Sequence, residues 1–579
     1  MNYSKMTKIT MIFLFAMLLL IGIAGAQEWV VTTPGDTAKN TNITDSANFT
    51  FRQAVEKSVS GDTITFASNI SAVNIIYGEI PIAKDLTISG NNANVIIGRS
   101  NSSATQEMGV FNISAGNVTF NRINIENGST TTGNGGALLV TGKANVTLES
   151  CTLQRNKAVN GGALYLDGGN VTMRSTTVYK NSAITEGGAF YIKNGTVTMS
   201  NGVVEAHTAK NNTIQVVKGE FDANAVNFNS NTVSDVGSTI NGAAGTLLTF
   251  KYCTFANNSG LKGGSIYALG TVNVDNCLFD SEKSVGSGGA ILLDSGSHGT
   301  IRYSIFSNNK AGDDGGAVHI GSNATATLDT CTFDNNSAGY GGAVFNIGNA
   351  TITSCTAINN TAKLFGGAIA AWNDGSTDMT KTVLTNNTAN GNGTNQSAGG
   401  GLNVSRGHAV LGNNVIVGNK DPKSVDFGEE NATVQSTGNN LVGLYRGTGK
   451  YPISSTDAAG ITADQVFDTS SGYPTLTKDT GYRAGTSQAV VYTVALNSSS
   501  SNPALSVLGT STGTPTQPSP ADNESDPSVP NETDTEKPDD GGNKVSWIWY
   551  VIVAVVVIAL LAASAYFLMQ YRKKRQYKF

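Results

Sequence analysis

Glycine-glycine-alanine triplets that recur about every 26 residues constrain the fold of this 579-residue chain more than any other feature. A bulky apolar residue followed by x-x-Asn recurs with the same period, as in Phe306 to Asn309 and Phe333 to Asn336. A fixed period in this range is typical of a solenoid, in which each repeat contributes one supersecondary unit. The triplets begin at Gly135, Gly161, Gly187, Gly288, Gly315, Gly341 and Gly366, with a Gly-Gly-Ser at Gly263.

The repeats contain short segments in which apolar and polar residues alternate, such as residues 163–166 and 170–173. This period of two, with many β-branched residues, predicts strands. A unit of this size cannot bury its own apolar face, so we expect a right-handed parallel β-helix of roughly a dozen coils. The glycine pair would form a tight turn, the recurring Asn a ladder and the recurring Phe an internal stack. Residues 213–240 keep the length but lose the glycines, which predicts one degenerate coil.

The two ends of the chain predict export and membrane attachment. Lys5 and Lys8 precede an apolar run, and a small-residue pattern near Ala26 is typical of a cleaved signal peptide. A long apolar stretch near the other end is followed by a basic cluster that begins at Arg572, which predicts a single transmembrane helix with its short tail inside the cell. The predicted parts are a signal peptide (1–26), an N-terminal cap with the first coils (27–110), the repeat β-helix (111–420), worn final coils with a cap (421–510), a Pro/Ser/Thr/Asp-rich stalk (511–546), the transmembrane helix (547–569) and the tail (570–579).

Composition limits the partners. Charged residues make up 14% of the chain and the formal net charge is −5, so nothing indicates nucleic acid as a partner. The expected partners are the membrane, through the C-terminal helix, and extracellular polysaccharides or surface proteins.

The Gly-Gly-Ala and Phe-x-x-Asn pairs resemble the repeats of polymorphic outer membrane proteins and related adhesin-like surface proteins, over residues 135–419. Phe51 to Val55 are similar to the first segment of many secreted β-helix proteins, where residues 50–58 would be a short helix that covers the open end of the core. The polymorphic proteins carry a C-terminal autotransporter barrel, where we expect a linker and a single helix in this chain, as in adhesin-like proteins of methanogenic archaea and some Gram-positive cells. The resemblance implies a cell-surface adhesin-like or structural envelope protein, not an enzyme.

One column of the repeat is a candidate binding surface. If Leu164 and Leu166 point inward, alternation directs the residue between them outward. Flat aromatic rows can bind sugar faces or another protein, although they can also simply cover neighbouring strands. The column contains Tyr165, Tyr191, Tyr267, His319 and Phe345.

A membrane-tethered polysaccharide lyase or glycoside hydrolase is the alternative function. Such a site needs paired carboxylates on neighbouring coils. The candidates are Asp313 and Asp314, with Asp294 on the preceding coil. The column of Asp314 holds a mixture of residue types in other repeats, which favours a solvent-facing loop tip. The other histidines, His207, His298 and His408, are too scattered for a metal site, so we expect no metal or cofactor.

The cysteines and the glycosylation motifs leave alternatives open. Cys151, Cys253, Cys277, Cys331 and Cys355 share one column, which favours buried apolar thiols, with disulfides possible only between Cys253 and Cys277 or between Cys331 and Cys355. Asn-x-Ser/Thr motifs are abundant, and such triplets also arise by chance in an Asn- and Thr-rich chain. The glycosylation candidates are Asn117, Asn145, Asn170, Asn323, Asn349 and Asn523.

Overall fold

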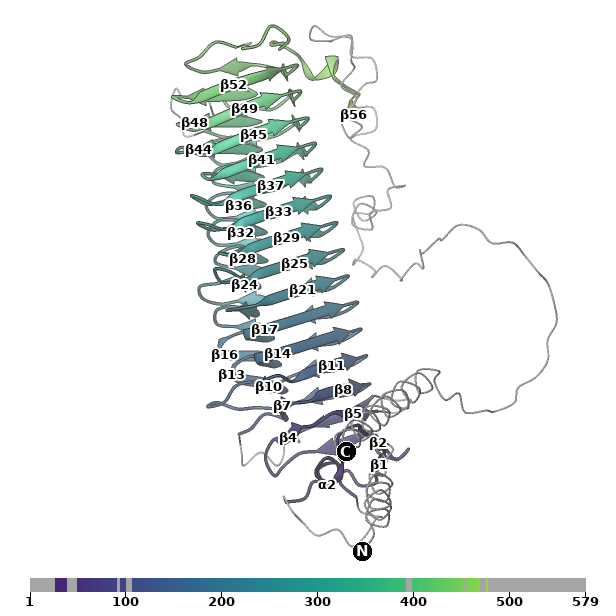
Figure 1. Ribbon diagram of the computed structural model, residues 1–579. Helices are drawn as coiled ribbons and strands as arrows, with labels where there is room; N and C mark the ends of the chain where they lie inside the picture. Colours follow the sequence, from purple (N-terminus) through teal and green to yellow (C-terminus); the bar gives the residue numbers. More distant parts are fainter. Residues whose placement is uncertain are drawn as a thin grey trace, which may run out of the picture. The chain divides into compact units, whose positions relative to one another are not determined.

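The chain forms a parallel β-helix, which confirms the predicted fold class (Figure 1). This computed structural model describes residues 26–38, 49–90, 94–99, 107–391, 398–451, 453–468 and 475–476. The predicted signal peptide, the stalk and the transmembrane segment lie outside these residues. Among the residues that are described, no helix has the length and apolar character needed to cross a membrane.

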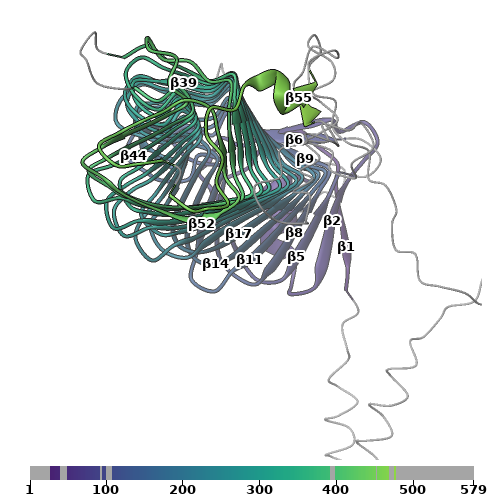
Figure 2. The same cartoon turned by 90° about the horizontal axis from the view of Figure 1, so that it is seen from above.

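Each coil contributes strands to parallel sheets of 29, 15 and 10 strands, called here the first, second and third sheet. A representative coil contains β32 (Ile291–Leu293) and β33 (His298–Arg302) in the first sheet, β34 (Ile305–Ser307) in the second and β35 (Lys310–Ala311) in the third. The second sheet receives one strand from each coil, so its 15 strands give somewhat more coils than the dozen predicted. Viewed along its axis, the solenoid shows its coils lying over one another (Figure 2).

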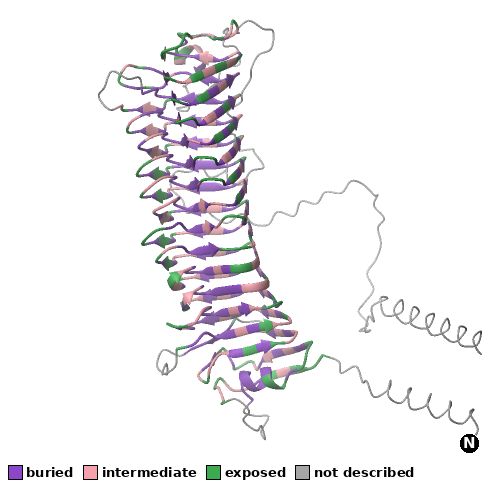
Figure 3. Cartoon of the chain, turned by 60° about the vertical axis from the view of Figure 1, so that its left-hand side comes forward, coloured by how far each residue is buried: buried purple, intermediate pink, exposed green. Residues whose placement is uncertain are grey.

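The core of the solenoid contains a column of phenylalanines. Phe228, Phe255, Phe279, Phe306 and Phe333 come from successive coils, and each is at most 2% exposed. Ring centroids of neighbours lie 4.5 Å apart for Phe255 and Phe279 and 5.1 Å apart for Phe306 and Phe333, with nearly parallel planes. Buried residues alternate with more exposed ones along many strands, such as β33, and Figure 3 shows this alternation by colour. This arrangement confirms the predicted internal stack.

The recurring asparagines form the predicted ladder at the corner that follows the second sheet. The backbone N–H and the side-chain Nδ2 of Asn309 both donate to Oδ1 of Asn336, at 3.0 and 2.9 Å. Nδ2 of Asn309 also donates to the carbonyl of Phe279, at 3.1 Å. These bonds satisfy buried polar groups that would otherwise destabilise the corner. The same ladder contains Asn156, Asn181, Asn231, Asn258, Asn309, Asn336, Asn360, Asn387 and Asn419.

Two titratable residues replace asparagine in this ladder. The Nδ1 of His207 accepts from the backbone N–H of Asn181 at 3.1 Å, and its Nε2 lies 3.0 Å from the carbonyl of Val178, so the ring takes the place of an amide. Burial lowers the pKa of His207 to about 4, which keeps the ring neutral. Glu282 is fully buried, and its Oε1 accepts from the N–H and Nδ2 of Asn258.

The glycine pair forms the sharp turn between the third and first sheets. Gly315 has a φ of 66°, and a Cβ on it would lie 2.3 Å from the carbonyl oxygen of Val318. A Cβ on Gly316 would lie 2.0 Å from the carbonyl oxygen of Gly342 in the next coil. A side chain at either position would therefore collide with backbone, which explains why the triplet keeps its glycines.

The N-terminal end is covered by α2 (Phe51–Lys57), as predicted from the similarity of this segment to other β-helix proteins. Thr50 and Gln53 form a capping box, which fixes where the helix begins. Phe51 is fully buried against the first coils, so the helix closes an otherwise open core. The stretch predicted to be degenerate stays in register through β20 (Ile214–Val216) and β24 (Ile240–Gly242). The last paired strand of the first sheet is β54 (Tyr445–Arg446).

All five cysteines are buried and free. They lie in a second ladder at another corner, where the N–H of Cys253 donates to Sγ of Cys277 at 3.4 Å and the N–H of Cys331 to Sγ of Cys355 at the same distance. Serine, threonine and asparagine take this position in other coils, for example Ser304, whose hydroxyl accepts from the N–H of Cys277. Cys277 and Cys355 therefore accept hydrogen bonds as well as filling space, which the prediction of apolar thiols did not include.

Candidate functional site

The predicted binding column lies on the outer face of the first sheet, in two groups. Tyr165 in β14 (Leu164–Arg174) pairs in register with Tyr191 in β17 (Phe190–Ser200), and their rings stack with centroids 5.3 Å apart and an interplanar angle of 3°. Gln215 and Asn241 then occupy the column. Aromatic residues resume at Tyr267, in β28 (Ile266–Ala268). The degenerate coil therefore divides the column.

The second group is joined by polar and aromatic contacts. The hydroxyl of Tyr267 donates to Oδ2 of Asp294 at 2.7 Å, and Nζ of Lys262 lies 5.1 Å from the ring centroid. His319, in β36 (Val318–Ile320), lies 5.2 Å from Phe345, in β40 (Val344–Asn346), with the rings tilted by 33°. Leu292 occupies the column between Tyr267 and His319.

These outward rings are less exposed than the alternation alone predicts. Tyr165 and His319 are each 9% exposed, and Phe345 is 7% exposed, although all three point away from the core. Tyr340 lies over Phe345, with centroids 6.1 Å apart, from the loop that carries the glycine turn. This loop tip covers part of Phe345, whereas Tyr165 is covered in part by its stacked neighbour Tyr191.

Three aromatic residues of this region were not among the predicted binding residues. Tyr340 and Trp372 make an edge contact with centroids 4.8 Å apart, and Phe365 lies 5.5 Å from Trp372. Trp372 ends β44 (Ile369–Trp372), two residues after the column position of Ala370, and Arg406 lies 6.0 Å above its ring. The alternation of that strand could have identified Trp372, whereas the approach of the loop tip depends on the tertiary structure.

The candidate catalytic carboxylates, Asp294, Asp313 and Asp314, do not form one catalytic acid/base pair, because Asp294 and Asp314 interact with different groups. Burial raises the pKa of Asp294, but hydrogen bonds from Tyr267 and Ser295 and the charge of Lys262 outweigh it, so the net pKa is lowered. Burial, followed by the charge of Asp313, raises the pKa of Asp314 to about 6. Asp294 thus interacts with groups of the sheet, whereas Asp314 interacts with its neighbour at the loop tip.

The histidines are separate, as the sequence predicts. His207 is buried in the Asn ladder, whereas His298 and His408 are exposed on the first sheet. His319 is nearly buried on the outer face, and burial lowers its pKa to about 4. Within the described part of the chain, no three His, Cys, Asp or Glu residues are grouped closely enough to hold a metal ion.

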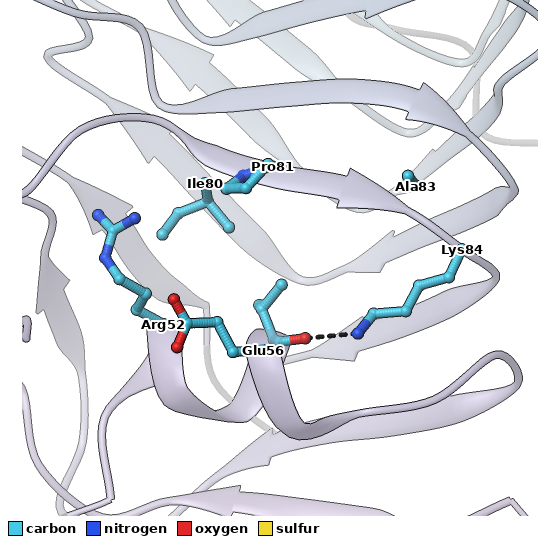
Figure 4. Close-up of a pocket in the computed structure, with 7 residues that line it drawn as sticks. Arg52, Glu56, Ile80, Pro81, Ala83 and Lys84 are labelled. Carbon is cyan, nitrogen blue, oxygen red and sulfur yellow. Dashed lines mark hydrogen bonds between the residues drawn. The ribbon is translucent and has the colours of Figure 1, made fainter. Parts of the chain in front are cut away.

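A cavity of about 210 Å³ lies between α2 and the strand β4 (Ile80–Ala83) (Figure 4). The two cationic side chains that line it, Arg52 and Lys84, both form hydrogen bonds that hold the fold together. Arg52 forms an ion pair with Asp36 at 2.9 Å and donates to the carbonyls of Gly78 and Glu79. Lys84 donates to the carbonyls of Val55, at 2.6 Å, and Ser58 at the end of the helix. The residues that line the cavity therefore hold the N-terminal helix α2 against the first coils.

The candidate glycosylation residues differ in their surroundings. Nδ2 of Asn145 donates to Oδ1 of Asn117 at 3.1 Å, and Nδ2 of Asn170 donates to Oδ1 of Asn145 at 3.0 Å. These three form an external amide ladder on one strand column of the first sheet. Asn349 lies in the same column of the sheet at a later coil, Asn323 is exposed in a turn, and Asn523 lies outside the described residues.

Residues 303–321 and 330–347 match the Chlamydia polymorphic membrane protein repeat. No curated protein matches the chain, and neither does any solved structure. The matched residues span β34 to β36 and β38 to β40, so each matched segment runs from the second sheet of one coil to the first sheet of the next. The repeat type and the fold fit a surface protein. The chain is a parallel β-helix protein in which two segments match the polymorphic membrane protein repeat.

Proposed function

We propose that this protein is an adhesin-like or structural component of the cell surface. The observation that carries the proposal is the coincidence of polymorphic membrane protein repeats with a long, in-register β-helix whose outer face presents an aromatic column. A single C-terminal membrane helix and a solvated stalk would hold the β-helix outside the cell, where it contacts glycans, matrix or other cells.

The arrangement of the candidate carboxylates supports binding of a glycan without its cleavage. The candidate carboxylates are divided between the sheet and a loop tip, and Asp294 is lowered in pKa by its hydrogen bonds. A glycosidase needs two carboxyl groups that flank one bond with opposed protonation. The raised pKa of Asp314 is the one observation that favours an enzyme, so the experiment must measure turnover as well as binding.

The test uses the full-length protein in detergent micelles with a panel of cell-wall and plant polysaccharides. Retention on a polymer and release of new reducing or unsaturated ends are both followed. We expect retention without new ends, and weaker retention when Tyr165, Tyr191 and Tyr267 are changed together to alanine. Tyr179→Ala, on the second sheet, is the matched control. New ends that disappear in Asp314→Asn would establish the enzyme instead.

The membrane arrangement is tested separately on intact cells. Protease added from outside should remove the β-helix and leave a short membrane-bound fragment. Protection of the whole chain would contradict the proposed orientation.

A further inference from the structure

We propose that the second aromatic group, from Tyr267 to Trp372, binds one chain of a neutral polysaccharide that runs along the axis of the β-helix. This inference rests on the proposed surface function and names the ligand class of its column. The residues involved, called here the aromatic strip, are Tyr267, Asp294, His319, Tyr340, Phe345, Phe365 and Trp372.

The strip is continuous along the axis. Tyr267 is bonded to Asp294, which lies on the coil between those of Tyr267 and His319. His319 contacts Phe345, which in turn lies beside Tyr340, with centroids 5.2 and 6.1 Å apart. Tyr340 then contacts Trp372 and Phe365. The ring and carboxylate groups therefore follow one another across five successive coils, from β28 to β44.

The spacing of the strip fits a polymer better than a compact ligand. Successive coils are about 4.8 Å apart, because each strand pairs with the same strand of the next coil. One sugar unit of an extended 1,4-linked chain has nearly this length. A chain laid along the axis would therefore place about one sugar on each coil, with apolar sugar faces against the partly exposed rings of Tyr340 and Trp372 and hydroxyls near Asp294.

The exposure of the strip is divided in a way that suits sugar binding. His319, Phe345 and Phe365 are at most 9% exposed and form a firm floor. Tyr340 and Trp372 are only partly buried and stand at the loop tip and strand end. Rings that are held on one side by packing lose little conformational entropy on binding, so they can contribute to affinity.

The charges of the strip select against acidic polymers. Carboxylates lie along its centre, where Asp294 is bonded to Tyr267 and Asp314, beside Asp313, pairs through its backbone with Tyr340. The cations, Lys262 and Arg406, lie over the rings of Tyr267 and Trp372 at its two ends. A polyuronate would bring its carboxylates against those of the centre, whereas neutral hydroxyls can donate to them.

The experiment measures retardation of the full-length protein in native gels that contain a neutral β-glucan, polygalacturonate or chitosan. We expect retardation by the β-glucan only, with little dependence on salt, because no ion pairs form. Tyr340→Ala and Trp372→Ala should each weaken binding at least about tenfold, since losing a stacked ring costs about 1.4 kcal/mol or more. Tyr179→Ala should bind as the wild type does. Far-UV circular dichroism verifies that each variant is folded.

Other outcomes separate the ligand class from the proposed function. Salt-sensitive binding of polygalacturonate or chitosan without binding of the β-glucan would overturn the neutral-glycan inference. Attachment to whole cells or matrix that persists unchanged in Tyr340→Ala and Trp372→Ala would also overturn it, while the surface function stands. Absence of attachment to any cell, matrix or polymer would instead contradict the proposed function itself.

Discussion

Glu282 makes the stability of the β-helix depend on pH in a direction opposite to that of an ordinary carboxylate. It occupies an asparagine position of the buried ladder, between Asn258 and Asn309. Its Oε1 accepts from the backbone N–H and Nδ2 of Asn258, at 3.2 and 3.1 Å, and Ser265 bonds to its Oε2. Burial, together with the nearby charge of Asp280, raises its pKa from 4.5 to about 8.

The sign and size of the effect follow from linkage between folding and protonation. Because the folded state holds its proton more tightly than the unfolded state, stability is greatest below pH 4.5 and falls as pH rises towards 8. Each pKa unit corresponds to about 1.4 kcal/mol, so the total loss is on the order of 5 kcal/mol. Roughly 3 to 4 kcal/mol of this loss falls between about pH 5 and pH 8.

Glu282→Gln isolates this contribution. The Gln carbonyl can accept the two bonds from Asn258, and its amide can donate to the hydroxyl of Ser265, without a proton to gain or lose. The variant should be more stable than the wild type by about 4 kcal/mol near pH 8 and by less than about 1 kcal/mol near pH 5. His207 titrates in both proteins and cancels in the difference between them.

The assay is urea unfolding of the full-length protein in micelles at several pH values, followed by far-UV circular dichroism. Hydrogen exchange of peptides from residues 253–284 shows whether the effect is centred on this coil, because solenoids can open locally. Glu149→Gln, an exposed carboxylate paired with Arg174, is the control and should change the pH dependence by less than about 1 kcal/mol. Parallel pH profiles for wild type and Glu282→Gln would refute the reasoning.

Other substitutions test the core, the cap and the outer face. Phe279→Ala should destabilise the protein by about 3 to 5 kcal/mol in urea unfolding, because its ring fills the central stack, and an unchanged midpoint would contradict that role. Arg52→Met should leave Asp36 without its buried ion pair and cost about 3 to 5 kcal/mol of cap stability, seen as faster proteolysis near residue 50, whereas wild-type protease resistance would argue against this fastening role. Mass spectrometry of peptides from the exported protein should find no glycan on Asn170, because its Nδ2 is hydrogen-bonded to Asn145. Asn323, which is exposed in a turn, is the accessible comparison. A glycan on Asn170 would show that the external amide ladder is dispensable.

Much of the fold follows from the sequence because a solenoid repeats its local chemistry. The glycine pair, the Phe stack and the Asn ladder each recur at one position per coil, so alignment of the repeats predicts which residues become neighbours. The N-terminal helix was also predictable, since Thr50 and Gln53 form a local capping box. The same alignment places His207 and Glu282 at ladder positions, where a polar residue other than Asn was the available signal.

Only the tertiary structure determined how accessible the candidate site is. Alternation directs Tyr165 and His319 outward, but it contains no information about the neighbouring side chains that leave each of them only 9% exposed. The contact between Tyr340 and Trp372 joins residues from different coils and different secondary-structure contexts. Its geometry depends on the glycine turn that follows Tyr340. Because glycine has wide conformational freedom, local sequence preference does not determine the path of this turn. The sequence thus determines the stacking of coils, whereas the approach of loops over the sheet is a property of the folded chain.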